Sequence, residues 1–217
     1  RRVKYILVEL ESSVLIIHLG MTGAVSFKKI NEYKKQKHDH LLIYFGNFIL
    51  VYNDVRKFGS IHITEDLKSM FLLKHLGPEP ISREFNSGYL YNISMKRVCS
   101  VKELIMNQKV VVGIGNIYAT ESLFLSKIHP ATAANLITQS QYKKLVTNIK
   151  KVLEKSIVMG GSTIKDFINA DGKPGYFTQK LSVYQRKFCP CHKKNLISNV
   201  KISGRSSFFC SKCQIQL

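Results

Sequence analysis

The stretch VVGIGNIYATESLF, residues 111–124, decides the fold of the second half of this 217-residue chain. Gly113 and Gly115 stand before a run that starts at Asn116 and predicts a helix. Backbone N–H groups at a helix N-terminus, with glycines that allow close approach, can bind a phosphate oxygen. Two such glycines are also common in ordinary tight turns, and the Lys-Ser/Thr pair of a P-loop does not follow. The stretch by itself therefore predicts a helix start more firmly than a phosphate site.

The pattern differs on the two sides of a linker. From Val3 to about Ile63, β-branched and aromatic runs such as VLIIHLG and NFILVYN predict strands, and hence half of a β-sandwich or barrel. Glycine and prolines in KHLGPEPIS mark a linker. After it, Ser100 and Glu103 form a capping-box pattern that predicts a short helix through Met106.

A longer helix is predicted from period-3.6 spacing. Its apolar face comprises Tyr142, Leu145, Ile149, Val152, Leu153 and Ile157. Five lysines occupy the other face, and we interpret them as solvated, without a specific contact.

The charge balance restricts the class of partner. Lys and Arg number 33 against 14 Asp and Glu, a net charge of +19, which points to a polyanion and first to nucleic acid. No apolar run reaches the roughly 20 residues of a spanning helix, and no signal-peptide pattern is present. Four of the five cysteines crowd into the last stretch, which suits metal binding in a reducing cytosol. We expect a cytoplasmic protein with no membrane partner.

Five further motifs occur in order with the first: HLGMTG (18–23), KHDH (37–40), YNDVRKFG (52–59), LGPEP (76–80) and DGKPGYF (171–177). In order and spacing the set resembles the formamidopyrimidine-DNA glycosylases, and the C-terminal cysteine hairpin follows as in that family. The resemblance implies base-excision repair of damaged double-stranded DNA: removal of oxidised purines such as 8-oxoguanine and formamidopyrimidines, then cleavage of the abasic strand by β,δ-elimination. It also implies a monomer associated with the nucleoid.

The same resemblance implies an α+β fold in three parts. These are a truncated N-terminal β-sandwich (1–75, front part missing), a helix–two-turn–helix domain with a lesion-capping loop (83–180), and a zinc-finger β-hairpin (181–217), with residues 76–82 as linker.

The resemblance also implies roles for single residues. An enzyme that attacks a base within a duplex must flip it out and fill the gap. The expected gap fillers are Met21, Arg56 and Phe58. The expected DNA contacts are His38, Arg56, Arg97, Lys102, Asn116 and, in the loop that caps the everted base, Lys173. Catalytic roles fall to Lys4, a proton donor in β-elimination, and to Arg205, tied to the δ step.

The hairpin departs from the family pattern of two Cys-x2-Cys pairs. Cys210 and Cys213 keep that gap, whereas Lys194 stands at the second ligand position of the first pair. A structural zinc needs four N or S donors. Cys189 and Cys191 together could complete a four-cysteine set, which we prefer, or Cys189 and His192 could do so. The remaining alternative is a ribbon without metal.

The front of the chain departs more. The family's nucleophile is an N-terminal proline with an adjacent glutamate, and this chain begins at Arg1 inside a predicted strand. We expect a fragment of a bifunctional glycosylase and lyase. The alternatives are an inactive lesion-binding remnant and, from another class, a basic zinc protein that binds RNA.

Overall fold

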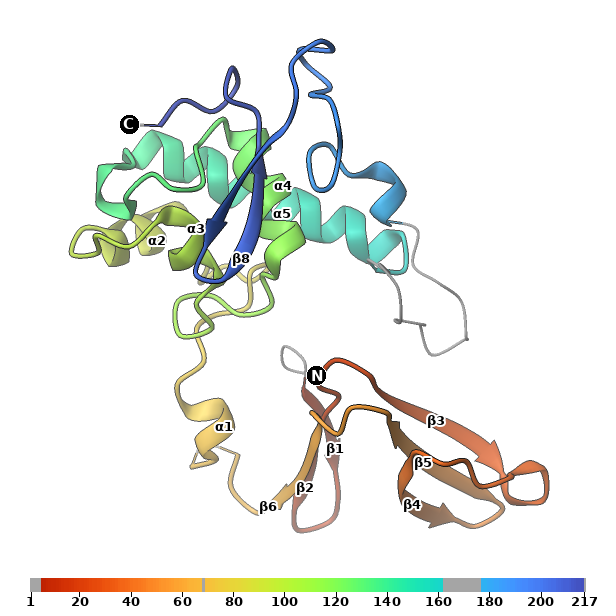
Figure 1. Cartoon of the computed structure of the whole chain (residues 1–217). Helices are drawn as coiled ribbons and strands as arrows, with labels where there is room; N and C mark the ends of the chain where they lie inside the picture. Colours follow the sequence, from red (N-terminus) through yellow and green to blue (C-terminus); the bar gives the residue numbers. More distant parts are fainter. Residues whose placement is uncertain (1–4, 68, 162–176, 217) are drawn as a thin grey trace. The chain divides into compact units, whose positions relative to one another are not determined.

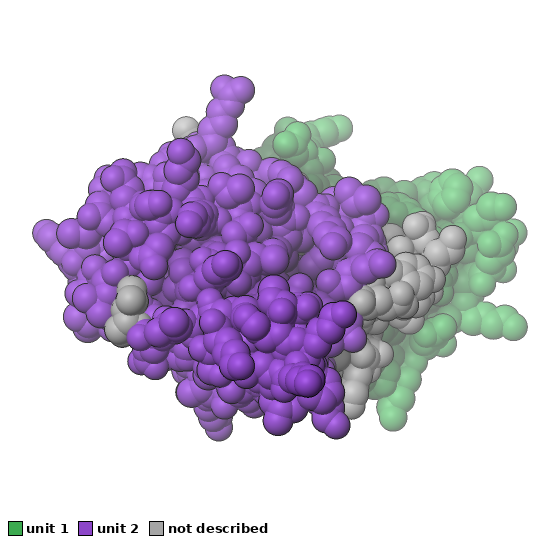
Figure 2. Space-filling view, turned by 90° about the horizontal axis from the view of Figure 1, so that it is seen from above, with its two compact units in different colours: residues 1–74, 162–175 green, residues 75–161, 176–217 purple. Residues whose placement is uncertain are grey.

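The computed structural model describes residues 5–67, 69–161 and 177–216, which divide into two compact units between Lys74 and His75 (Figure 2). The first unit is rich in strands, and the second contains the main helices and the C-terminal hairpin (Figure 1). This confirms the expected α+β class. None of the helices within the described residues is long and apolar enough to cross a membrane.

The first unit contains two antiparallel sheets of three strands each. One has the order β1-β2-β6 and the other β3-β5-β4. Their bounds are β1 Tyr5–Glu9, β2 Val14–His18, β3 Gly23–Lys29, β4 Asp39–Phe45, β5 Phe48–Asp54 and β6 Ser60–Thr64. A short 3-10 turn, η1 (Ile30–Glu32), follows β3, and a helical turn, α1 (Phe71–Lys74), closes the unit.

Within the two sheets of this unit, the buried residues lie on the central strands, as their β-branched runs predict. Ile16 and Ile17 of β2 are fully buried, and β5 buries Ile49 through Tyr52 on both of its faces. The ladder between β4 and β5 shifts register between Asp39 and Leu41. Such an irregularity re-aims a side chain, and the His40 ring nitrogen Nε2 lies 2.8 Å from the carbonyl oxygen of Asp54 at the end of β5.

The two helix starts predicted around the opening motif are confirmed. Helix α3 (Val101–Met106) begins where the Ser100 side chain accepts a hydrogen bond from the Glu103 amide, and α4 (Asn116–Ser126) follows Gly115 as its cap. An earlier helix, α2 (Ser87–Ser94), capped by Asn86, was not predicted. Its weakly amphipathic sequence gave no clear period, and it is stabilised by packing against α5.

Helix α5 (Gln139–Val158) corrects one predicted core residue. Tyr142, Leu145 and Ile149 are buried as expected, but Ile157 is 65% exposed. The helix ends one residue later, so its last turn extends beyond the core. Val146, which the predicted face omitted, is buried instead.

The remaining elements are η2 (Ala134–Leu136), η3 (Phe177–Lys180) and the hairpin of β7 (Ser198–Ile202) with β8 (Arg205–Phe209). Strand β8 packs against α4, as Figure 1 also shows. The segment before the hairpin is held by buried Glu121 of α4. Its carboxylate accepts hydrogen bonds from three successive backbone amides, those of Ser182, Val183 and Tyr184.

Candidate DNA interface and metal cluster

Two loops of the strand-rich unit hold the expected gap fillers. Met21 lies in the turn between β2 and β3, and Arg56 and Phe58 lie in the loop between β5 and β6. Met21 is 65% exposed and Phe58 62% exposed, so neither is a core residue. Exposed large apolar side chains on short loops are suited to insert into a base stack.

Asp54, at the end of β5, joins these two loops. Its side chain is fully buried and accepts hydrogen bonds from the hydroxyl of Thr22, beside Met21, and from the backbone amide of Arg56 (3.2 Å). Burial alone would raise the pKa of Asp54, but the hydrogen bonds that it accepts lower it to about 2. The loops are thus fastened to one carboxylate that stays ionised.

The structure describes only some of the other residues that are expected to act on or contact the DNA. His38 is half-buried, and its carbonyl oxygen accepts a hydrogen bond from the Asp54 amide (3.0 Å), which places it beside the two loops. Lys4 and Lys173 lie outside the described residues. In the helical unit Arg97 is exposed between α2 and α3.

In the helical unit, two expected DNA contacts converge on the hairpin. Lys102 of α3 and Asn116, the first residue of α4, both donate to the carbonyl oxygen of Ser206, at 3.2 and 3.0 Å. Lys102 also donates to the Ser207 hydroxyl. The residue before Ser206 is Arg205, so the chain that carries the expected catalytic arginine is tied to the N-terminal ends of two helices.

The environment of Lys102 changes its acid-base behaviour. The side chain is almost fully buried, at 1% exposure, and burial lowers its pKa to about 8, with the charge of Arg205 acting in the same direction. A pocket of about 300 Å³ opens beside it, lined by Lys102, Glu103, Met106, Asn107, Ile202, Ser203 and Arg205. Two cations, Lys102 and Arg205, line one pocket and make it a polar site suited to an anion.

The hairpin gathers four ligand atoms. The sulfurs of Cys189, Cys210 and Cys213 and the Nδ1 atom of His192 lie within 4.8 Å of one another. The Cys189 and Cys213 sulfurs are 3.7 Å apart, and the Cys213 sulfur is 3.3 Å from His192 Nδ1. Tetrahedral zinc with bonds of about 2.0–2.3 Å separates its ligands by roughly 3.4–3.8 Å, so the donor set fits the metal.

The cluster departs from the preferred four-cysteine set. Cys191 is exposed and lies outside the group, and His192 takes its place. The reason is the local turn. The Cys189 amide donates a hydrogen bond to the Asn195 carbonyl oxygen (2.9 Å), and the Asn195 amide donates one to the His192 carbonyl oxygen (2.7 Å). This turn brings Cys189 and His192, three residues apart, to one side and leaves Pro190 and Cys191 between them exposed to solvent.

Thiol chemistry also favours a cation in the cluster. Burial would raise the pKa of Cys210, but neighbouring hydrogen bonds, first that from the Cys213 amide, lower it to about 6. Burial and the adjacent Cys189 and Cys210 sulfurs raise the pKa of Cys213 to about 12. Clustered thiols cannot all ionise without a compensating positive charge, and a metal ion supplies it.

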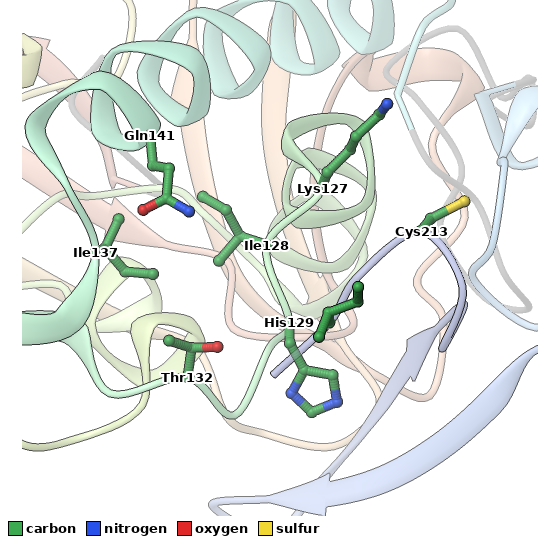
Figure 3. A pocket seen from close by; sticks show the side chains of 8 residues that line it. Lys127, Ile128, His129, Thr132, Ile137, Gln141 and Cys213 are labelled. Atoms are coloured by element: carbon green, nitrogen blue, oxygen red, sulfur yellow. The ribbon is translucent and has the colours of Figure 1, made fainter. Parts of the chain in front are cut away.

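A second, smaller hollow lies between the end of α4 and the C-terminal segment (Figure 3). It has a volume of about 210 Å³ and is lined by Lys127, Ile128, His129, Thr132, Ile137, Gln141, Cys213 and Ile215. Figure 3 shows the Cys213 sulfur directed away from Ile128 and Thr132. The hollow therefore shares Cys213 with the metal cluster, but the sulfur of that residue does not point into it.

Several residues of these sites escaped the sequence analysis. Asp54 lies inside the motif YNDVRKFG, and the only indication of its role in the sequence was that it is a single acidic residue close to two basic ones. Glu121, Ser206 and Ser207 gave no pattern. Gln214, buried and bonded to the Ile128 carbonyl oxygen at 2.8 Å and to the Cys210 amide at 3.1 Å, follows the last ligand directly.

The chain is strongly basic, exposes Met21 and Phe58 on two joined loops, and has a cationic pocket and a hairpin with a Cys/His cluster. These features define the class of protein: one that binds a polyanion. The comparisons with known proteins place it within that class. The family model for the formamidopyrimidine-DNA glycosylase N-terminal domain matches residues 1–61, and that for the formamidopyrimidine-DNA glycosylase H2TH domain matches residues 76–168. The chain belongs to the formamidopyrimidine-DNA glycosylase family, DNA glycosylases of DNA repair.

Relatives with this description are similar over nearly all of the chain. The formamidopyrimidine-DNA glycosylase of Glaesserella parasuis is 48% identical over 99% of this chain and 79% of its own length. That of Legionella pneumophila (strain Lens) is also 48% identical, with the same coverage.

Solved structures of the same family resemble this chain in fold as well as in sequence. A Lactococcus lactis enzyme variant in complex with DNA containing Fapy-dG is 34% identical with a TM-score of 0.89, covering all of this chain and 80% of that one. The wild-type Lactococcus enzyme in complex with DNA containing an oxidised pyrimidine has a TM-score of 0.87 at 34% identity and the same coverage.

Proposed function

We propose that the protein binds damaged double-stranded DNA, excises oxidised purines such as 8-oxoguanine and formamidopyrimidines, and cleaves the abasic strand by β,δ-elimination. The observation that carries this proposal is the wedge of Met21, Arg56 and Phe58. Two large apolar side chains stay in solvent on loops that a buried carboxylate holds together. Such a wedge suits the void that an everted base leaves.

Each wedge residue has a distinct role in this proposal. The apolar ends of Met21 and Phe58 support the bases next to the gap, because unstacked neighbours lose their contact area. The Arg56 guanidinium donates to the acceptors of the cytosine left without a partner. Purine lesions paired with cytosine are therefore the expected substrates.

Backbone contacts hold the DNA in register. Lys102 and Asn116, with Arg205 beside them, bind the phosphates at the lesion, while His38 and Arg97 bind phosphates elsewhere. These contacts neutralise backbone charge and release counterions, so affinity falls steeply with salt. They read no sequence, which suits a protein that must find rare lesions anywhere.

Base excision and strand cleavage need an amine that attacks the sugar C1′ as the damaged base leaves, and groups that transfer protons during elimination. Lys4 donates a proton during β-elimination, and Arg205 acts at the δ step. The family resemblance assigns the attacking amine to an N-terminal proline. A terminal amine suits that task because its pKa, near 8, leaves a useful neutral fraction at neutral pH.

Borohydride trapping tests the glycosylase and lyase. The native protein, isolated from its own cell, is incubated with an 8-oxoguanine:cytosine duplex and reduced. We expect a covalent protein–DNA adduct, and none with an undamaged duplex. Intact mass of the same preparation identifies its N-terminal residue. A native terminus at Arg1 with no adduct, but with selective binding of the lesion duplex, would establish the inactive remnant instead. Equal affinity for undamaged RNA would establish the RNA-binding alternative.

We further propose one structural zinc ion, held by Cys189, His192, Cys210 and Cys213. When bound, the ion cross-links the hairpin and stiffens the strand that carries Arg205. Metal analysis of two variants and the wild type tests the ligand set. Loss of zinc in His192→Ala, with full retention in Cys191→Ser, is expected. Loss in Cys191→Ser with retention in His192→Ala would restore the four-cysteine set, and absence of zinc from the wild type would remove the metal altogether.

A further inference from the structure

We propose that Asp54 is a positioning residue for the lesion wedge, which locks the two loops that carry Met21, Arg56 and Phe58 into one shape before DNA arrives. The inference rests on the proposed function of those three residues. Asp54 itself does not reach the DNA, because its side chain is fully buried.

Both oxygens of the Asp54 carboxylate are used, and they serve different segments. Oδ1 accepts from the Thr22 hydroxyl and the Arg56 amide, and the Arg56 amide also lies 3.1 Å from the Thr22 hydroxyl oxygen. Oδ2 accepts from the Gly59 amide at 2.9 Å and from the Tyr52 hydroxyl at 3.1 Å. The turn with Met21 is thus linked through Thr22 to both ends of the loop with Phe58.

The two loops also touch directly through glycines. A Cβ atom on Gly20, whose φ is +59°, would come within 2.6 Å of the Phe58 backbone. A Cβ atom on Gly59 would come within 2.6 Å of the His18 carbonyl oxygen and overlap the Tyr52 hydroxyl. The backbones are so close that a side chain at either glycine would push one loop away from the other, so the two loops pack as one unit.

The loop with Phe58 has a backbone that needs support. Lys57, directly before Phe58, adopts a left-handed φ of 55°, which is uncommon for a residue other than glycine. The Arg56 and Gly59 amides on its two sides both donate to Asp54. The carboxylate therefore holds the strained residue from both ends, and Phe58 is directed outward as a consequence.

A locked wedge has a functional advantage. Loops that order only on binding lose conformational entropy at that moment, which weakens insertion into the stack. A wedge fixed in advance keeps that free energy for opening the duplex. It also fixes where the Arg56 backbone starts, and so how its guanidinium meets the opposite base.

The test uses Thr22, because its hydroxyl links the loops while its side chain is neither in the wedge nor fully buried. Thr22→Val keeps the shape and removes the hydroxyl, and Thr22→Ser restores it. Thr64→Val, in β6 of the same unit, is the matched control. Asp54→Asn replaces an accepting oxygen with a donating amide group, and Phe58→Ala tests the wedge itself.

The probe is a duplex with a tetrahydrofuran abasic analogue opposite 2-aminopurine, whose fluorescence rises when a neighbouring stack opens. Affinity is measured in parallel for this analogue opposite cytosine or adenine and for an undamaged duplex. In Thr22→Val and Asp54→Asn we expect the fluorescence change to slow by about 5- to 10-fold and the cytosine preference to shrink, because a lost hydrogen bond loosens the loops. Undamaged-duplex affinity should stay within about twofold.

Thr22→Ser and Thr64→Val should behave as the wild type. A general loss of stability in unit 1 would weaken all DNA binding together, so only the selective loss supports positioning. If Phe58→Ala abolishes the fluorescence change while Thr22→Val and Asp54→Asn match the wild type, the Asp54 inference is overturned and the proposed function stands. If Phe58→Ala itself changes nothing, the proposed wedge fails, and the inference with it. Should Asp54→Asn not fold, the Thr22 pair decides.

Discussion

Glu121 offers the sharpest test of how the hairpin is attached to the helices. The residue lies on α4, almost fully buried, and the amides of Ser182, Val183 and Tyr184 donate to it at 2.7, 2.9 and 2.9 Å. Its Oε1 atom accepts two of these bonds and its Oε2 atom the third. We predict that Glu121→Gln loosens this segment without unfolding α4.

The magnitude follows from the bonds that glutamine can keep. Its single oxygen can retain the Val183 and Tyr184 bonds in neutral form, while its amide group faces the Ser182 amide and cannot accept. A charge-assisted bond is worth about 1.5–3 kcal/mol and a neutral one about 1 kcal/mol, and part of the loss is offset because no charge is buried. The net cost is about 2–3 kcal/mol, which corresponds to roughly 30- to 150-fold in an equilibrium constant.

Amide hydrogen exchange measures this directly, because the protein has two units and a single unfolding midpoint would mix them. We expect exchange to accelerate by that factor at Ser182, which loses its acceptor, and at Val183 and Tyr184, whose bonds weaken, with no change in the core of β5. Glu103→Gln, an exposed acid on α3, is the control. Acceleration below about threefold would show that the three bonds do not hold the segment and would refute the reasoning.

Three further predictions concern the helical unit. Burial lowers the pKa of Lys102 to about 8, so the side chain is charged below that pH and loses its charge above it. DNA affinity, measured by fluorescence anisotropy titration, should therefore fall as the pH rises through 8, and Lys102→Arg should remove that decline. From this group alone, the free energy of unfolding should rise between pH 8 and the ordinary value of 10.5, since there the unfolded chain binds more protons. Gln214→Ala leaves the Ile128 carbonyl oxygen and the Cys210 amide without their partner, so the proposed zinc should pass to a chelator several times faster than from the wild type or from the control Gln139→Ala, which is exposed. Val146→Ala should lower the free energy of unfolding of the helical unit by about 1–3 kcal/mol, measured in urea by circular dichroism of the helices, whereas Ile157→Ala should change that free energy by less than about 0.5 kcal/mol. Equal effects would contradict the burial pattern of α5.

Local patterns were enough for the parts of the fold that short-range physics controls. The Ser100 cap, the helix start at Asn116 and the strand runs of the first unit follow from capping chemistry and hydrophobic period, which act within a few residues. The same patterns failed for α2 and for Ile157. There the outcome depends on which surface packs against the helix, and no window of sequence contains that information.

The metal cluster shows the limit of spacing arguments. Counting residues allowed Cys191 or His192 as the fourth donor, and the choice depended on a turn closed by the Asn195 backbone. That turn directs Cys191 to solvent and His192 toward the three sulfurs. Two backbone hydrogen bonds, which the sequence does not reveal, therefore decide which four donor atoms lie together.

By itself the sequence determined the class of fold, the polyanionic partner and, through its ordered motifs, the family. Only the tertiary structure decided how the functional residues are supported: Asp54 under the wedge, the Ser206 carbonyl oxygen between Lys102 and Asn116, and Glu121 beneath the hairpin. The physical reason is distance along the chain. Lys102 and Ser206 are 104 residues apart, and Thr22 and Asp54 are 32 apart, so their contacts exist only once the chain has folded.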